Sequence, residues 1–172
     1  EGNLLATIRC GWNVRTLLQP GKLKLLLREM DRCNVQLLGI SEMRWSGKGH
    51  FSSSDGHVIY YSGKESGGRN GVAFIANKFI SKHVMGYNPV NDRIITIRLQ
   101  AKPINVSLVQ VYAPTSTATE EDVECFHNQL QDVVDSLPNK DFVVVMGDFN
   151  AKVGSGIQLE QERDVIGKFG LG

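Results

Sequence analysis

The chain has 172 residues, of which 41% are hydrophobic and 22% are charged, and its formal net charge is +1. These values are typical of one globular domain with a core of useful size, and they exclude collagen-like, low-complexity and broadly disordered proteins. A charge so close to neutral does not by itself indicate a nucleic-acid-binding protein, because phosphate contacts usually require a strongly basic surface.

The charges and cysteines narrow the class further. The first fifty residues are rich in Arg and Lys, whereas residues 120–135 are acidic and contain no Lys or Arg, which permits a basic face without requiring one. Cys10, Cys33 and Cys125 are odd in number and widely spaced, which argues against a disulfide framework and a zinc site. No run of 18 apolar residues and no signal peptide is visible, so we expect an intracellular protein without a membrane partner.

Taken in chain order, the first half predicts strands around one helix. Apolar residues at helical spacing predict the helix over 22–33, after a turn at 19–21. The Gly- and Ser-rich stretches 45–55 and 62–71 are interpreted as loops. Short apolar or alternating runs predict strands over 4–13, 35–40, 57–61 and 72–76.

The second half predicts three more strands and a second helix. Alternation over 93–99 and 104–111 predicts an antiparallel pair with one buried face. Thr119 is a predicted N-cap, followed by an acidic first turn and a helix that Pro138 ends. The run 142–146 is apolar throughout, which predicts a central strand. The order of elements indicates an α/β fold in which helices cover a sheet, without strict βαβ winding.

Polar residues follow four of the predicted strands. In open α/β sheets, functional groups collect at strand ends. One Asp or Asn after a strand is most often a turn or cap residue, but four such ends together, two of them acidic, favour an active site. The residues concerned are Asn13, Glu42, Tyr112, Asp148 and Asn150.

These residue types suit phosphodiester hydrolysis. The reaction needs a cation to neutralise negative oxygens, and Mg²⁺ typically takes one or two carboxylates plus waters. Glu42 suits the metal, and Asp148 suits the orientation or deprotonation of water. Asn13 and Asn150 can hold a phosphate oxygen or a neighbouring acid without adding charge. Tyr112 can donate a hydrogen bond to a phosphate oxygen or act as an acid.

Five segments resemble, in order and spacing, the motifs of the endonuclease/exonuclease/phosphatase superfamily. They are WNVRT (12–16), ISEMRW (40–45), RNGVAF (69–74), QVYAPT (110–115) and GDFNAKVG (147–154). The resemblance implies a DNase I-like α/β sandwich of two packed sheets flanked by helices, with 1–172 as a single partial domain. The wording of these segments, and of IGKFGLG (166–172), is similar to RTE/BovB-type LINE retrotransposon endonucleases and to craniofacial development protein 2-like host proteins.

The resemblance also implies a role for each candidate residue. Glu42 would bind Mg²⁺, with Mn²⁺ as an alternative, and Asp148 would position or activate water. Asn150 would lie against the scissile phosphate, Tyr112 would donate a transition-state hydrogen bond, and Asn13 would support Glu42 and the phosphate. Trp12 and Phe149 would be packing neighbours.

Basic residues near these motifs are candidate contacts to DNA, the substrate that the resemblance implies. Arg15 and Arg44 lie within two motifs, and solvated surface charge is an equal interpretation for both. Arg69 belongs to a Gly-rich loop that lacks the context of a P-loop, so we interpret the loop as a turn whose Arg69 can reach the site.

The sequence departs from the family pattern near its end. That pattern continues with an Ile-Asp-Tyr-like motif and a final Ser-Asp-His motif, which supply a further Asp and a His. The four histidines, His50, His57, His83 and His127, are interpreted as surface or loop residues and not as substitutes. We therefore expect weak or no nuclease activity from these residues alone, and an exposed apolar sheet face that a protein partner or second copy covers.

The leading hypothesis is a Mg²⁺-dependent DNA endonuclease domain of retroelement origin. It would nick one strand and leave the 3′ hydroxyl that primes reverse transcription, which implies a nuclear location. The first alternative is a catalytically dead, domesticated or truncated module that acts by protein binding. The second is a phosphatase of the same superfamily, because the reaction core is shared.

Overall fold

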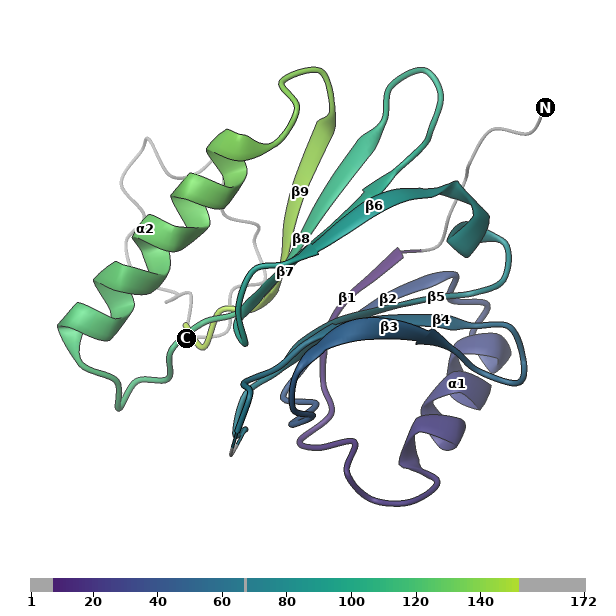
Figure 1. Cartoon of the computed structure of the whole chain (residues 1–172), viewed down its shortest axis with the longest axis horizontal. Helices are drawn as coiled ribbons and strands as arrows, with labels where there is room; N and C mark the ends of the chain where they lie inside the picture. Colours follow the sequence, from purple (N-terminus) through teal and green to yellow (C-terminus); the bar gives the residue numbers. More distant parts are fainter. Residues whose placement is uncertain (1–7, 67, 152–172) are drawn as a thin grey trace, which may run out of the picture.

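Two β-sheets pack face to face, and one helix covers the outer face of each (Figure 1). The computed structural model describes residues 8–66 and 68–151. The predictions for residues 4–7, Gly67 and 152–172, including the IGKFGLG segment at 166–172, lie outside the described residues. Within the described part, no helix is long and apolar enough to cross a membrane.

The first sheet has five strands in the order β1-β2-β5-β4-β3. β1 runs parallel to β2, and the other neighbours are antiparallel. The strands are β1 (Ile8–Asn13), β2 (Leu37–Ser41), β3 (Lys48–Ser52), β4 (Val58–Ser62) and β5 (Val72–Ala76). Helix α1 (Lys22–Arg32) buries Leu26, Leu27 and Met30 against this sheet, as its helical spacing predicts.

The second sheet has four strands in the order β6-β7-β8-β9. β6, β7 and β8 are antiparallel neighbours, and β9 runs parallel to β8. The strands are β6 (Val84–Pro89), β7 (Ile94–Leu99), β8 (Val106–Tyr112) and β9 (Phe142–Asp148). A short 3₁₀ helix, η1 (Ile80–His83), joins the two sheets.

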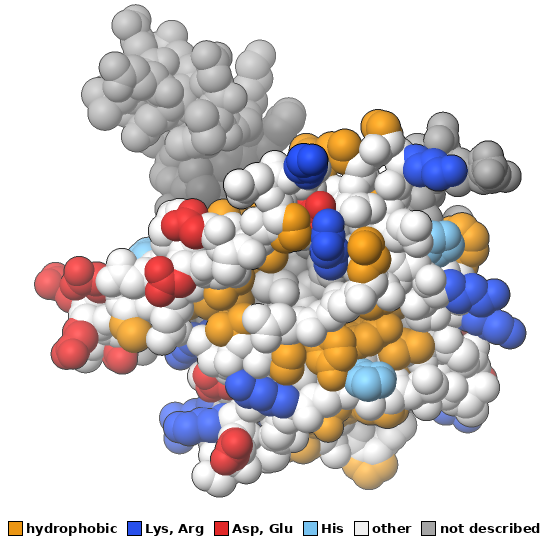
Figure 2. Space-filling view, turned by 45° about the horizontal axis from the view of Figure 1, so that its top comes forward, with side chains coloured by type: hydrophobic (Ala, Val, Ile, Leu, Met, Phe, Trp, Pro, Cys, Tyr) orange, Lys and Arg blue, Asp and Glu red, His pale blue; other side chains and the backbone are white. Residues whose placement is uncertain are grey.

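Helix α2 (Glu120–Ser136) covers the outer face of the second sheet with Phe126 and Val133. The predicted N-cap is confirmed: the Thr119 side chain accepts from the Asp122 amide at 3.1 Å, and Asp122 Oδ2 accepts from the Thr119 amide at 3.3 Å. This capping box satisfies two amides that a helix start otherwise leaves unpaired. The acidic side chains of α2 are exposed, and Figure 2 shows acidic groups gathered on the side where α2 lies.

Alternate residues of the strands form the core between the sheets. Phe74 and Leu37 from the first sheet meet Ile97 and Leu108 from the second, and all four are at most 1% exposed. The same strands direct their intervening residues to the helices, for example Ile75 to α1 and Val109 to α2. Two apolar faces per strand explain why these runs are apolar throughout.

Two predictions about the strands were wrong, and one strand was not predicted. β3 lies within the stretch interpreted as a Gly- and Ser-rich loop, because its exposed residues need not be apolar to pair with β4. β6 was not predicted, since its exposed polar and Gly residues hide its alternation. β9 is not central: in the described part it pairs only with β8, and Phe142 is 58% exposed.

His57 is also a correction, because it is buried and not a surface residue. It is 3% exposed, and its Nε2 lies 3.1 Å from Asp31 Oδ1 of α1. His50 and His127 are exposed, as expected. His83 ends η1 with its Nδ1 3.0 Å from the Phe79 carbonyl oxygen.

Candidate active site

The ends of four strands converge because each sheet contains one parallel pair. β1 and β2 end together at Asn13 and Ser41, and β8 and β9 end together at Tyr112 and Asp148. β1 also contacts β9 across the interface between the sheets. Asn13 forms the junction: its Nδ2 donates to Glu42 Oε1 at 3.0 Å and to Asp148 Oδ2 at 3.2 Å, the latter 135 positions away in the chain.

Glu42 is held mainly by neutral donors. The Tyr112 hydroxyl donates to Glu42 Oε1 at 2.6 Å, which is the same oxygen that Asn13 contacts. The nearest cation, Arg44 Nη2, lies 3.5 Å from Glu42 Oε2. Burial raises the pKa of the Glu42 carboxyl, but the hydrogen bonds from Tyr112 and Asn13, together with Arg44, outweigh burial and hold it below its ordinary value.

Tyr112 is buried at 5% exposure and stays protonated at neutral pH. Burial and its hydrogen bond to Glu42 raise the pKa of Tyr112 to about 12. Its hydroxyl therefore serves as a hydrogen-bond donor, here to Glu42 Oε1.

The backbone around Glu42 adopts conformations that non-glycine residues rarely take. Glu42 has φ +57° and Arg44 has φ +62°. The connection at 70–71 holds this segment, because Met43 N donates to the Gly71 carbonyl at 3.2 Å and Arg44 N donates to the Asn70 carbonyl at 2.9 Å. Such left-handed residues cluster at functional sites and persist only when the surroundings hold them.

The segment after β9 orients Asp148 and Asn150. The Asn150 amide donates to Asp148 Oδ1 at 3.0 Å, and Asn150 Nδ2 donates to the Ala113 carbonyl at 2.7 Å. Gly147 has φ +145°, and a Cβ there would lie 2.0 Å from the Val111 carbonyl oxygen. Only glycine allows β9 to approach β8 at this point, which explains the Gly before Asp148.

The structure thus brings together all five residues singled out for chemistry: Asn13, Glu42, Tyr112, Asp148 and Asn150. Among the basic candidates, only Arg44 contacts this group through its side chain within the described ranges 8–66 and 68–151. Arg15 is exposed and its amide donates to Asn13 Oδ1 at 3.0 Å. Arg69 is exposed on the connection between β4 and β5. Trp12 and Phe149, expected as packing neighbours of the site, are half-exposed, at 50% and 45%.

The carboxylate oxygens of the site could serve as ligands of a divalent cation. No group of three or more His, Cys, Asp or Glu side chains placed to bind a metal occurs in the part of the chain that the structure describes. Mg²⁺ usually needs only one or two carboxylates, with water completing its shell. Glu42 Oε2 accepts no bond shorter than 3.5 Å among the described residues, so this oxygen of an ionised carboxylate fits such an ion.

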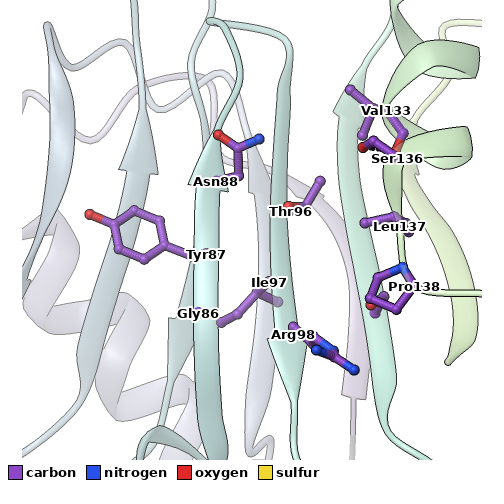
Figure 3. A pocket seen from close by; sticks show the side chains of 11 residues that line it. Gly86, Tyr87, Asn88, Thr96, Ile97, Arg98, Val133, Ser136, Leu137 and Pro138 are labelled. Atoms are coloured by element: carbon purple, nitrogen blue, oxygen red, sulfur yellow. Dashed lines mark hydrogen bonds between the residues drawn. The ribbon is translucent and has the colours of Figure 1, made fainter. Parts of the chain in front are cut away.

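A cavity lies at the opposite end of β8 from these residues. This cavity has a volume of about 260 Å³, and β6, β7 and the end of α2 line it (Figure 3). At its edge, Arg98 donates to Asp141 through Nε at 2.6 Å and through Nη2 at 2.9 Å, and Ser107 Oγ donates to Asp141 at 2.7 Å. The Asp141 carboxylate is thus paired with a cation, Arg98, whereas Glu42 in the candidate site is held mainly by neutral donors.

The sequence interpretation missed Arg93, which contacts Tyr112. Its guanidinium carbon lies 5.4 Å from the centre of the Tyr112 ring, and its Nη1 donates to the Tyr112 carbonyl at 3.1 Å. The available signal was an Arg placed directly before a strand, after two residues that favour turns, Asn91 and Asp92.

Two face-to-face mixed sheets with outer helices and polar residues at joined strand ends define a DNase I-like α/β sandwich. The chain belongs to the endonuclease/exonuclease/phosphatase family, whose sequence profile matches residues 10–157. Divalent-metal dependence is typical of this family. The family and the fold expected from the motifs are therefore confirmed.

Relatives and solved structures agree with this assignment. Craniofacial development protein 2 of Tragulus javanicus is 46% identical over 161 residues, covering 94% of this chain and 27% of that protein. The chain thus spans about a quarter of the length of this relative. An AP endonuclease from Archaeoglobus fulgidus has a TM-score of 0.64 at 15% identity, with 88% of this chain and 60% of that chain covered. A 3′ phosphatase from Neisseria, bound to product DNA hairpin, has a TM-score of 0.63 at 17% identity, with 86% and 59% covered.

Proposed function

We propose that this chain carries the metal-binding and water-orienting side of a site that hydrolyses phosphodiester bonds in DNA. The observation that supports this most is the Asn13 amide, which joins Glu42 of the first sheet to Asp148 of the second. The amide aligns two carboxylates without neutralising either one. In a purely stabilising cluster, a cation such as Arg or Lys would be expected between the two carboxylates in place of the neutral Asn13 amide.

The side chains divide the work as follows. Glu42 would hold Mg²⁺, or Mn²⁺, which would neutralise charge on the phosphate oxygens. Asp148 accepts a hydrogen bond from attacking water and takes its proton. Tyr112 keeps its proton at neutral pH and donates its hydroxyl hydrogen to Glu42 in the free protein. When substrate binds, the same hydrogen is donated to a phosphate oxygen. The Asn13 side-chain amide holds both carboxylates, and the Asn150 backbone amide holds Asp148. The Asn150 side chain, which gives one hydrogen to the Ala113 carbonyl, donates its other hydrogen to the phosphate.

The finer proposal is that the substrate is chromosomal DNA and that the ancestral reaction is single-strand nicking by an RTE/BovB-type LINE endonuclease. Arg15, Arg44 and Arg69 follow β1, β2 and β4, on the connections nearest the site, and would meet the backbone phosphates. The exposed acidic face of α2 disfavours DNA on the opposite flank (Figure 2). Such a role implies a nuclear location, and we propose that 1–172 forms one partial domain of the family fold.

Nicking of supercoiled plasmid by this chain tests the proposal. We expect slow Mg²⁺-dependent conversion to open circles, abolished by EDTA and by Glu42→Gln or Asp148→Asn. Asp141→Asn is the matched control, since this acid lies at the other end of β9. Folded protein that neither nicks DNA nor binds Mg²⁺ would overturn the proposal.

A second candidate function is protein binding, which exposed apolar side chains favour. Trp12 on β1 is 50% exposed and Phe142 on β9 is 58% exposed, and both strands pair on one side only within the described residues. Sedimentation of the wild type and of Trp12→Ser/Phe142→Ser tests self-association. Identical monomeric profiles would remove a second copy as the occupant.

A further inference from the structure

The turn at 91–93 lies between the two halves of the candidate site. Asn91 Oδ1 accepts from the amides of Arg93 at 2.8 Å and Ile94 at 2.9 Å, which fixes the turn locally. The Ser62 hydroxyl donates to the Asn91 carbonyl at 2.6 Å, which ties the turn to the end of β4. The start of β7 is therefore anchored to the first sheet, although its own hydrogen bonds belong to the second.

From this turn, Arg93 contacts Tyr112 in three ways. The Tyr112 amide donates to the Arg93 carbonyl at 2.9 Å, and Arg93 Nη1 donates back to the Tyr112 carbonyl at 3.1 Å. The guanidinium also lies over the ring, 5.4 Å from its centre. A cation over an aromatic face is attracted to the ring. The two hydrogen bonds to the Tyr112 amide and carbonyl fix the backbone from which the ring extends. Together they aim the hydroxyl at Glu42 Oε1, 2.6 Å away.

The same turn supports the segment that carries Glu42. Gly71 N donates to the Asp92 carbonyl at 2.9 Å, and Asn70 Nδ2 donates to Asp92 Oδ2 at 2.8 Å. The carbonyls of Asn70 and Gly71 in turn accept from Arg44 and Met43, directly after Glu42. Gly71 has φ +112°, a conformation that favours glycine, and a Cβ there would also lie close to this segment, 3.0 Å from Met43 Cγ and 3.2 Å from Arg44 N.

We propose that Arg93 is a positioning residue for Tyr112, and that the turn at 91–93 sets the Tyr112 hydroxyl and the Glu42 carboxylate against each other. This inference rests on the proposed function for its catalytic meaning, but the positioning itself is a property of the folded chain. Groups that orient the residues of a metal site typically change affinity or rate by about 10–100-fold when they are removed.

The first test observes the Tyr112 hydroxyl directly and needs no catalysis. NMR of protein with labelled tyrosine rings follows the exchange of that hydroxyl proton with water, which its short bond to Glu42 slows. Arg93→Met removes the ring contact and the donor, and we expect exchange at least about tenfold faster, corresponding to a weakened hydrogen bond. Arg93→Lys keeps a charge over the ring and should restore most of the protection. Arg98→Met, in the same sheet but paired with Asp141, is the matched control and should leave the Tyr112 signal unchanged.

The second test measures Mg²⁺-dependent nicking by the same variants. For Arg93→Met we expect kcat to fall about tenfold or more with little change in KM, and partial rescue by Arg93→Lys. Unchanged hydroxyl exchange in folded Arg93→Met overturns the inference, whatever the nicking rate. If Arg93→Met does not fold, Arg93→Gln, which keeps a hydrogen-bond donor but places no charge over the ring, replaces it: unchanged hydroxyl exchange overturns the inference, and faster exchange supports it. Faster exchange in Arg93→Met, together with no nicking by the wild-type protein, supports the positioning role and counts against the proposed function instead.

Discussion

The two ends of β9 each carry a carboxylate-centred cluster, and the two clusters are built differently. Directly before the strand, the Asp141 side chain is 1% exposed and accepts two hydrogen bonds from Arg98 and one from Ser107. At the last residue of the strand, the cluster around Asp148 includes Glu42, whose side chain is 17% exposed and accepts short hydrogen bonds from Tyr112 and Asn13. One acid is paired with a cation, and the other is held by neutral groups.

Both carboxyl groups have lowered pKa values, but the causes differ. The hydrogen bond from Arg98 is the main reason that the pKa of Asp141 lies below its ordinary value. For Glu42, burial works against ionisation and is outweighed by hydrogen bonds from Tyr112 and Asn13. The nearest cation to Glu42, Arg44 Nη2, is 3.5 Å from Oε2, and a carboxylate whose charge is held mainly by neutral donors retains its attraction for a further cation. The difference separates a structural acid from an acid available to a metal and substrate.

The largest expected difference between the Glu42 and Asp141 clusters is in catalysis. Glu42→Gln keeps an oxygen that can accept from Tyr112 and Asn13, but it removes the charge. We expect Mg²⁺-dependent nicking to fall by about 100-fold or more, because charge stabilisation of this kind dominates such reactions. Plasmid nicking under single-turnover conditions measures it. If Asp141→Asn reduces nicking as strongly, the distinction between the two acids fails.

The reverse effect is expected for stability. Asp141→Asn leaves Arg98 without its partner carboxylate, so the urea midpoint should fall with an unchanged m-value, and by more than in Glu42→Gln. Arg98→Met should lower the midpoint too. The double variant should lose less than the sum of the single losses, because it removes both partners of one ion pair. Additive losses would show that the pair does not act as a unit.

The sequence predicts well those parts of this molecule that depend on local pattern. The amphipathic stripe of α1, the capping box at Thr119 and the alternation of β7 and β8 are confirmed because neighbours along the chain decide them. The prediction of a central position for β9 was wrong, because an apolar run indicates that both faces of a strand contact apolar groups but does not indicate which strands lie beside it. His57 was misjudged because its burial depends on α1 passing over β4.

The candidate site shows the same division. The five polar residues were identifiable from their places at strand ends and from the family motifs. Their connections were not, since the Asn13 bridge depends on β1 meeting β9 across two sheets. The left-handed backbone of Glu42 and the contact between Arg93 and Tyr112 likewise depend on chain segments distant in sequence. Residue types predict chemistry here, whereas tertiary contacts decide which groups touch.

A smaller effect on catalysis is expected from the neutral donors that hold Glu42. Tyr112→Phe keeps the buried ring and removes one hydroxyl, so Glu42 Oε1 keeps only the bond from Asn13. A hydrogen bond to a charged group contributes about 1.5–3 kcal/mol, and we expect a nicking rate lower by about tenfold or more. Tyr60→Phe is the matched control, because it removes a hydroxyl from a tyrosine whose ring packs against Tyr87 and His50. Equal rates for the two variants would remove Tyr112 from the reaction.

The smallest effect is on the acid limb of stability, and it distinguishes the two clusters by pH. Asp141 has a pKa below its ordinary value in the folded state, so its contribution is fully present above the unfolded pKa of about 4 and is lost as pH falls through the lower folded pKa. We expect the urea midpoint to be nearly constant from about pH 7 to pH 5 and then to fall. In Asp141→Asn this fall should be shallower, because the variant has already lost the ionised form. Glu42→Gln should flatten it less, since burial offsets part of what Tyr112 and Asn13 contribute. A fall as steep in Asp141→Asn as in the wild type would mean that other carboxylates cause it, and that the ion pair with Arg98 does not set the acid stability of this end of the sheet.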